Sequence, residues 1–170
     1  MDDSSDRKAA FTPADTQPAE VPRQGPLLGL DYGTRRIGVA ICPPEQNFAA
    51  PLEIIQRTTV EQDAKRLEFL ATDYRAVGLV VGLPVHMSGD EGGKAREARR
   101  FGGWASQITR LPVVYWDERY TSAAADELLA ATGLKSKKRR DRLDSVAAQQ
   151  ILQSFLDSKD RGARPTAIDR

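Results

Sequence analysis

A continuous apolar run near the middle of the chain, Val77 to Leu83 (VGLVVGL), narrows the possible folds most. Such a run is typical of a strand covered on both faces, and strands of that kind occur in sheets that have helices on either side. The run ends at Pro84, a residue that cannot continue a central strand. It therefore predicts an α/β domain in which this segment is a central strand.

The segments around this run follow the order three strands, helix, strand, helix, strand, helix, helix. Runs rich in β-branched residues predict further strands at 26–31, 36–42, 52–57 and 112–116. Apolar residues at helical spacing predict helices at 60–74, 95–108, 121–133 and 142–156. An initial meander followed by alternating strands and helices predicts a five-stranded mixed sheet flanked by helices on both faces.

The chain of 170 residues has the length of one domain. We predict a disordered leader over residues 1–24, a folded domain over 25–157 and a flexible tail over 158–170, because both ends are polar and lack periodicity. No apolar segment is long enough to cross a membrane, and no secretory signal is visible. These features favour a cytoplasmic location.

Cysteine and histidine each occur once, as Cys42 and His86. A single cysteine cannot form an intrachain disulfide, which fits a reducing compartment, and we interpret Cys42 as a small residue at the edge of the core rather than a nucleophile. A single histidine argues against histidine-based triads and zinc sites with several histidines. The chemistry of this chain must therefore depend on carboxylates, hydroxyls or lysines.

Three carboxylates occupy positions where an acid is costly unless it binds something. Asp31 ends the first predicted strand, Glu118 follows the fifth, and Asp144 lies on the apolar face of the last helix, in line with Ala148 and Leu152. Hard divalent cations prefer such oxygen ligands, and a pair of them can activate water against a phosphodiester. For Asp144, helix capping and a buried ion pair remain alternatives. Weaker candidates are Asp117, which alternation puts on the opposite face from Glu118, and Asp90, Glu91 and Asp141.

Basic charge is concentrated between Lys135 and Arg142, where six of eight residues are Lys or Arg, although the net charge of the chain is only +1. Such a block is either a solvated loop or a surface that faces an anion. Next to a cluster of acids suited to phosphodiester chemistry, contact with a nucleic-acid backbone is the favoured interpretation.

Taken together, four motifs resemble the YqgF/RuvX family, whose members are described as Holliday junction resolvases and as pre-16S rRNA nucleases. They are GLDYGTRRIGVA from Gly29, GLP from Gly82 with Gly89 and EG from Glu91, WDERYT from Trp116, and KKRR from Lys137 leading into LDSVAA from Leu143. The resemblance covers roughly residues 26–156. One departure is His86, at a loop position where an asparagine is expected.

This resemblance implies a ribonuclease H-like fold and hydrolysis of phosphodiester bonds that depends on Mg²⁺ or Mn²⁺, with Asp31, Glu118 and Asp144 as both metal ligands and catalytic residues. The substrate would be structured nucleic acid, either Holliday junction DNA or the 5′ end of pre-16S rRNA. Branched DNA would require a homodimer that presents two active sites, whereas precursor RNA would not. Both substrates are therefore alternatives.

Contacts to the substrate are expected mainly at its backbone. We expect Lys137, Lys138, Arg139 and Arg140 to contact phosphates without regard to sequence. Arg35 and Arg36 could hold a phosphate or form an ion pair with Asp31 or Glu118. The backbone near Gly89, Gly92 and Gly93 could form a phosphate cradle or a simple turn. For Tyr32, Trp104 and Tyr120, packing is favoured over base stacking.

Two other functions are alternatives to a nuclease. A non-catalytic nucleic-acid-binding or ribosome-associated factor could keep the same fold. An actin-like or sugar-kinase-like phosphotransferase could share the Asp31-x-Gly33-Thr34 turn, but that fold needs two such domains and this chain has room for one.

Overall fold

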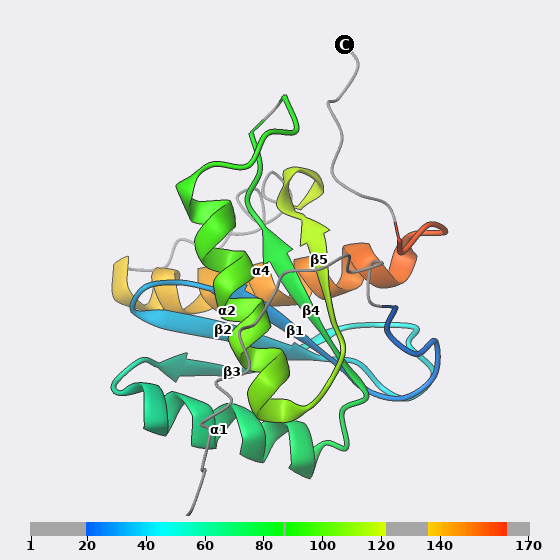
Figure 1. The fold of residues 1–170 in the computed structure, drawn as a ribbon, viewed down its shortest axis with the longest axis horizontal. Coiled ribbons are helices and arrows are strands. Elements are labelled where there is room, and N and C mark those ends of the chain that lie inside the picture. The colour runs from blue at the N-terminus through cyan, green and yellow to red at the C-terminus, as the bar shows by residue number, and fades with distance from the viewer. Residues whose placement is uncertain (1–19, 87, 122–135, 163–170) are drawn as a thin grey trace, which may run out of the picture.

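A computed structural model of the protein describes residues 20–86, 88–121 and 136–162 (Figure 1). The side chains of residue 120 and of residues 136–144 lie outside this description. The predicted leader falls mainly outside it, as does the end of the predicted tail. Among the described residues at the two ends, the Val21 side chain packs against Gly78. Arg161 donates a hydrogen bond to the Leu156 carbonyl oxygen (3.1 Å).

The five strands form one mixed sheet in the order β3-β2-β1-β4-β5. Strands β1 and β2 pair antiparallel, as do β2 and β3, whereas β4 lies parallel to β1 and β5 parallel to β4. The strands are β1 (Leu27–Tyr32), β2 (Arg36–Ile41), β3 (Ala50–Gln56), β4 (Gly78–Leu83) and β5 (Val113–Asp117). This arrangement confirms the predicted five-stranded mixed sheet, and every residue of β4 is buried, as its apolar run predicted.

Helices cover both faces of this sheet (Figure 1). The helices α1 (Val60–Asp73) and α2 (Gly93–Thr109) pack against each other on one face, and α4 (Ser136–Asp157) crosses the other. Helix α1 begins at a threonine cap, where the Thr59 side chain accepts a hydrogen bond from the Gln62 backbone N–H (3.2 Å).

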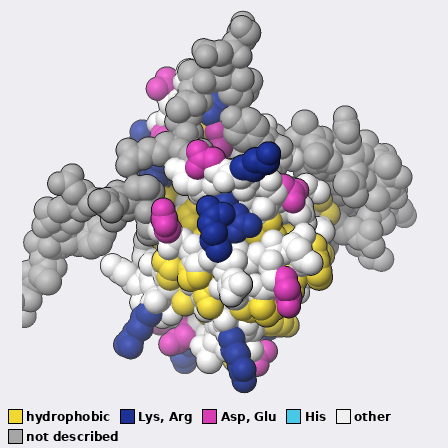
Figure 2. Space-filling model, turned by 90° about the vertical axis from the view of Figure 1, so that its right-hand side faces the viewer, with side chains coloured by type: hydrophobic (Ala, Val, Ile, Leu, Met, Phe, Trp, Pro, Cys, Tyr) yellow, Lys and Arg dark blue, Asp and Glu magenta, His cyan; other side chains and the backbone are white. Residues whose placement is uncertain are grey.

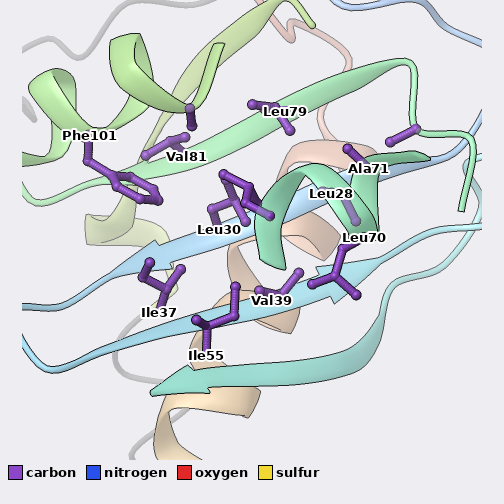
Figure 3. Packing of buried hydrophobic residues seen from close by; sticks show 13 residues of the cluster. Leu28, Leu30, Ile37, Val39, Ile55, Leu70, Ala71, Leu79, Val81 and Phe101 are labelled. Atoms are coloured by element: carbon purple, nitrogen blue, oxygen red, sulfur yellow. The ribbon is translucent and has the colours of Figure 1, made fainter. Parts of the chain in front are cut away.

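Alternation along β1 divides the core between these two faces. Leu28 and Leu30 point into the cluster beneath α1 and α2, which also contains Ile37, Val81 and Phe101 (Figure 3). On the other face, Leu27 packs with side chains of α4, among them Ala148, Ile151, Leu152 and Phe155. Each helix thus buries an apolar stripe against one face of the sheet.

The last helix begins earlier than its sequence predicted. We expected a basic loop followed by a helix from about residue 142, but α4 already begins at Ser136 and includes the basic block. Lysine and arginine are good helix formers, and this propensity outweighs the mutual repulsion on which the loop prediction rested. The helix predicted over residues 121–133 lies almost wholly outside the described residues.

Cys42 has the buried place that its sequence context predicted. Its side chain is 1% exposed, and its sulfur accepts a hydrogen bond from the Leu27 backbone N–H at 3.2 Å. Burial raises the pKa of the Cys42 thiol above its ordinary value. The thiol is therefore a packing group. None of the described helices combines the length and the apolar character that crossing a membrane would require.

Two neighbouring glycines of α2 offer a matched test of its packing. A Cβ atom at Gly102 would lie 2.6 Å from the Tyr115 ring, whereas one at Gly103 would meet no atom within 4 Å. We expect Gly102→Ala to lower the free energy of unfolding by about 1–3 kcal/mol through overpacking. Gly103→Ala should raise it by about 0.5–1 kcal/mol through helix propensity. Urea unfolding of both variants measures these changes, and equal effects would contradict this packing of α2.

Candidate active site

Two of the three predicted acids lie at the same edge of the sheet. Asp31 is the next-to-last residue of β1, and Glu118 follows β5 directly as the first residue of the short 3-10 helix η1 (Glu118–Tyr120). Because β1, β4 and β5 run parallel, their carboxyl ends meet at one edge. In open α/β sheets that edge is where ligands bind.

Both acids also lie on the face of the sheet that α4 covers. A Cβ atom at Gly29 would lie 2.7 Å from Leu152 Cβ, so Gly29 faces α4, and strand alternation gives Asp31 the same face. At Gly82 of β4, a Cβ atom would collide with the Glu118 carboxylate and lie 2.5 Å from Ile151 Cδ1. The Glu118 carboxylate therefore lies directly over Gly82, beside α4.

Gly82 brings the two acids within reach of each other. The pairing of β1 with β4 joins Leu30 to Val81, and the next step along both strands sets Asp31 beside Gly82. Adjacent strands are about 4.8 Å apart, so the Glu118 carboxylate, which lies over β4, is roughly one strand spacing from β1. Any side chain at Gly82 would occupy the space of that carboxylate. Sequence reasoning included Gly82 in a motif but missed this role.

The negative charge of the Glu118 carboxylate is only weakly offset by its surroundings. Burial raises its pKa above the ordinary value, neighbouring Asp117 raises it further, and Lys94 lowers it. Among the described residues, none donates a hydrogen bond to this carboxylate. A partly buried carboxylate that receives no hydrogen bond from the described residues is suited to bind a divalent cation, because a cation would offset both the desolvation and the repulsion from Asp117.

Asp117 has a different, structural role. Its carboxylate accepts hydrogen bonds from the Arg119 backbone N–H (2.9 Å) and from Arg119 Nε (2.8 Å), and both side chains are almost fully buried. Arg119 Nη1 also donates to the His86 carbonyl oxygen (3.3 Å). The pair thus ties the end of β5 to the loop that follows β4. Sequence reasoning included Arg119 in the WDERYT motif but did not predict this pairing.

The third acid, Asp144, lies in α4 one helical turn before Ala148, and its side chain lies outside the described part of the chain. In Figure 1 the N-terminal half of α4 lies by the β1–β2 turn, the end of the sheet where β1 reaches Asp31. The side chains of Lys137, Lys138, Arg139 and Arg140 fall outside the description as well. Within the described residues alone, His, Cys, Asp and Glu form no group of three suited to a metal ion.

The other predicted contacts lie at the same end of the sheet. Arg35 is exposed in the β1–β2 turn and Arg36, partly buried, begins β2. The loop after β4 is a turn in which Gly89 has φ 87° and donates to the His86 carbonyl oxygen (2.8 Å). At the start of α2, a Cβ atom at Gly92 would lie 2.6 Å from His86 Nε2. The exposed His86 side chain therefore borders the helix N-terminus.

Tyr32 and Trp104 both pack against the core cluster that includes Phe101, each with part of its surface exposed, and the Tyr120 side chain lies outside the described part of the chain. At the opposite end of the molecule, where α4 ends, Lys and Arg side chains alternate with Asp and Glu (Figure 2). Positive and negative side chains are therefore mixed on that surface, and neither charge predominates there.

A mixed sheet of this order, with helices on both faces, is the arrangement expected from the resemblance to a ribonuclease H-like family. The profile of the RuvX family, described as a Holliday junction resolvase, matches residues 25–158, and the chain belongs to this family. The chain is thus a member of a nuclease family, as its motifs predicted.

Individual relatives are similar over most of their length. A candidate pre-16S rRNA nuclease of Rhodopirellula baltica is 43% identical over 148 residues, covering 86% of each chain. One of Cereibacter sphaeroides is 43% identical over 142 residues, covering 84% of this chain and 89% of the relative. Among solved structures, Thermus thermophilus RuvC in complex with a Holliday junction substrate has a TM-score of 0.47 at 16% identity, covering 77% of this chain and 93% of that one.

Proposed function

We propose that this chain is a metal-dependent endonuclease in which Asp31, Glu118 and Asp144 bind Mg²⁺ or Mn²⁺. The observation that carries the proposal is the Glu118 carboxylate over Gly82, on the α4 face of the sheet, about one strand spacing from the strand that bears Asp31. Helical periodicity supports Asp144 as the third ligand, because it is seven residues before Ile151, which meets the same Gly82.

The chemistry follows from these positions. A bound divalent cation would polarise the scissile phosphate and lower the pKa of a bound water. Asp31 in β1 and Glu118 directly after β5 would hold it, and their attachment to the same sheet fixes their separation. The buried Asp117–Arg119 pair would keep Glu118 turned towards α4. Arg35 and Arg36, at the same edge, would orient the phosphate.

The substrate class follows from the family and from the relatives' names. We propose structured nucleic acid, either branched DNA or the 5′ end of pre-16S rRNA, with contacts from Lys137, Lys138, Arg139 and Arg140 to the phosphate backbone. Cleavage of a four-way junction would need two active sites and hence a homodimer. The single cysteine, buried as a thiol, is consistent with work in the cytoplasm.

A panel of nucleic acids tests this function against the alternative of a non-catalytic binding factor. Four-way junctions, duplexes and structured precursor RNA are incubated with Mg²⁺ or Mn²⁺ and wild-type protein or Asp31→Asn. A nuclease should cleave at least one substrate only with metal, and Asp31→Asn should bind that substrate but fail to cleave it. Absence of metal-dependent cleavage on every substrate would favour the binding factor.

The basic block gives a prediction about salt. Replacing Lys137, Lys138 and Arg139 by Ala should reduce the slope of log affinity against log salt by about 2–3, because each lost phosphate contact removes nearly one unit. The measurement is a titration of duplex at several salt concentrations. Triple replacement of Lys65, Arg66 and Arg75, which are exposed on and just after α1, is the control. Equal slopes for wild type and the block variant would mean that the block faces elsewhere.

A further inference from the structure

We propose that a pocket between α1 and α2 binds an unpaired nucleobase of the substrate strand, an inference that rests on the proposed nuclease function. The pocket has a volume of about 210 Å³ and lies on the face of the sheet opposite the acids. Its principal lining residues are Tyr32, Arg57, Val60, Arg100, Phe101 and Trp104.

Three aromatic rings line this pocket, and the partly exposed Trp104 offers its ring for stacking. Tyr32 stacks on Phe101 with ring centroids 4.9 Å apart and 29° between planes, and Trp104 follows at 5.7 Å from Phe101. Phe101 is buried, whereas Tyr32 and Trp104 remain partly exposed. Proteins bind unpaired bases on aromatic side chains of this kind, because every base has a flat π face.

Two cations, Arg57 and Arg100, flank the aromatic wall, and the carboxylates of Asp63 and Glu97 complete the lining of the pocket. Arg57 lies over the Tyr32 ring, 5.2 Å from its centroid, and is held by Asp63 Oδ2 (3.2 Å) and by the Gly33 carbonyl oxygen (3.2 Å). Arg100 is exposed at the other side and has no ion-pair partner among the residues that the structure describes. A positioned cation and an exposed one beside aromatic rings suit a base with its attached phosphate.

The pocket is close to the proposed cleavage site along the chain. Tyr32 follows Asp31 directly in β1, so their side chains take opposite faces of the same strand end. Arg57 also donates hydrogen bonds to the Gly33 and Thr34 carbonyl oxygens in the β1–β2 turn, which follows Asp31 and Tyr32 directly. A strand with its phosphate at the acids could pass over this turn and place a neighbouring base in the pocket. Exposed Lys94 and Arg96 on α2 would attract its backbone.

Trp104 provides a direct test, because the chain has two tryptophans and the other, Trp116, is 8% exposed and donates to Ser154 Oγ. In the Asp31→Asn background, which should prevent cleavage, a short oligothymidylate should quench Trp104 fluorescence. An abasic phosphodiester of equal length should bind more weakly and leave the fluorescence unchanged. Trp104→Ala should weaken oligothymidylate binding about tenfold or more, with an unaltered salt slope, because it removes stacking rather than a charge.

The structure offers a matched control and a second variant. Phe69 is 52% exposed on α1 with Arg66 over its ring (5.1 Å), the same pairing outside the pocket, so Phe69→Ala should leave binding unchanged. Val60→Glu places a negative charge at the pocket rim, at the first residue of α1 where an acid is tolerated, and should weaken binding without loss of fold.

Several results would overturn the pocket assignment: equal affinity for abasic and base-bearing strands, no effect of Trp104→Ala, or an equal loss in Phe69→Ala. These measurements record binding alone. A wild-type protein that prefers base-bearing strands but cleaves nothing would therefore refute the nuclease function and retain the pocket.

Discussion

Glu118→Gln should reduce metal-dependent cleavage about 10³-fold and, without metal, make the protein more stable. The loss of activity follows because a metal contributes several kcal/mol to transition-state stabilisation, and each 1.4 kcal/mol is tenfold in rate. The gain in stability follows because burial and Asp117 raise the pKa of the Glu118 carboxyl. Cleavage assays and metal-free urea unfolding at pH 7 measure the two effects.

The sign of the stability change comes from linkage. A carboxyl whose pKa is higher in the folded state stabilises the fold below its unfolded pKa, and that contribution is lost as pH rises through the folded pKa. At neutral pH, the charged Glu118 is therefore a cost, and glutamine should recover about 1 kcal/mol, the common size of a stabilising substitution. Glu68→Gln, at an exposed position of α1, is the control and should change neither quantity. An equally active Glu118→Gln protein would contradict its role as a ligand.

Arg119→Met should lower the free energy of unfolding by about 3–5 kcal/mol, more than removal of an arginine from an exposed ion pair. The substitution leaves the Asp117 carboxylate buried without its ion-pair partner, and it also removes the bond to the His86 carbonyl oxygen. Urea or thermal unfolding measures the loss. Amide exchange should rise in the loop that follows β4.

A surface ion pair of the same type provides the comparison. Arg66 pairs with Glu53, and the Arg66 side chain is 45% exposed, so Arg66→Met should change the free energy of unfolding very little. Adding Asp117→Asn to Arg119→Met should restore part of the stability, since the unpaired charge is then gone. Similar losses for Arg119→Met and Arg66→Met would contradict the buried environment of the Asp117–Arg119 pair.

The sheet was predictable from sequence because its signals are local and strong. The apolar run of β4, the glycine-containing turn between β1 and β2, and the β-branched runs each identify a strand within about two residues of its observed bounds. Conversely, the start of α4 was mispredicted, because charge repulsion within the basic block suggested a loop, whereas the helix propensity of lysine and arginine favours a helix that includes this block.

The candidate site was only partly predictable. Strand alternation is sufficient to separate Asp117 from Glu118, and the resemblance carried by the motifs identified Asp31, Glu118 and Asp144. No local pattern could show that Gly82 makes space for the Glu118 carboxylate or that Arg119 reaches the loop at His86, since both depend on contacts between distant segments. The pocket between α1 and α2 is likewise a product of helix packing.

The most direct test of the acidic centre is a Mn²⁺ titration by calorimetry of wild-type protein, Asp31→Asn, Glu118→Gln and Asp144→Asn. Each variant should bind the ion at least about tenfold more weakly than wild type. Loss of a residue that only hydrogen-bonds to a metal ligand typically lowers metal affinity by about tenfold or more, and loss of a ligand should have at least that effect. Glu68→Gln should bind like wild type. Wild-type affinity in all three variants would show that these side chains do not share a metal, and the proposed function would be wrong.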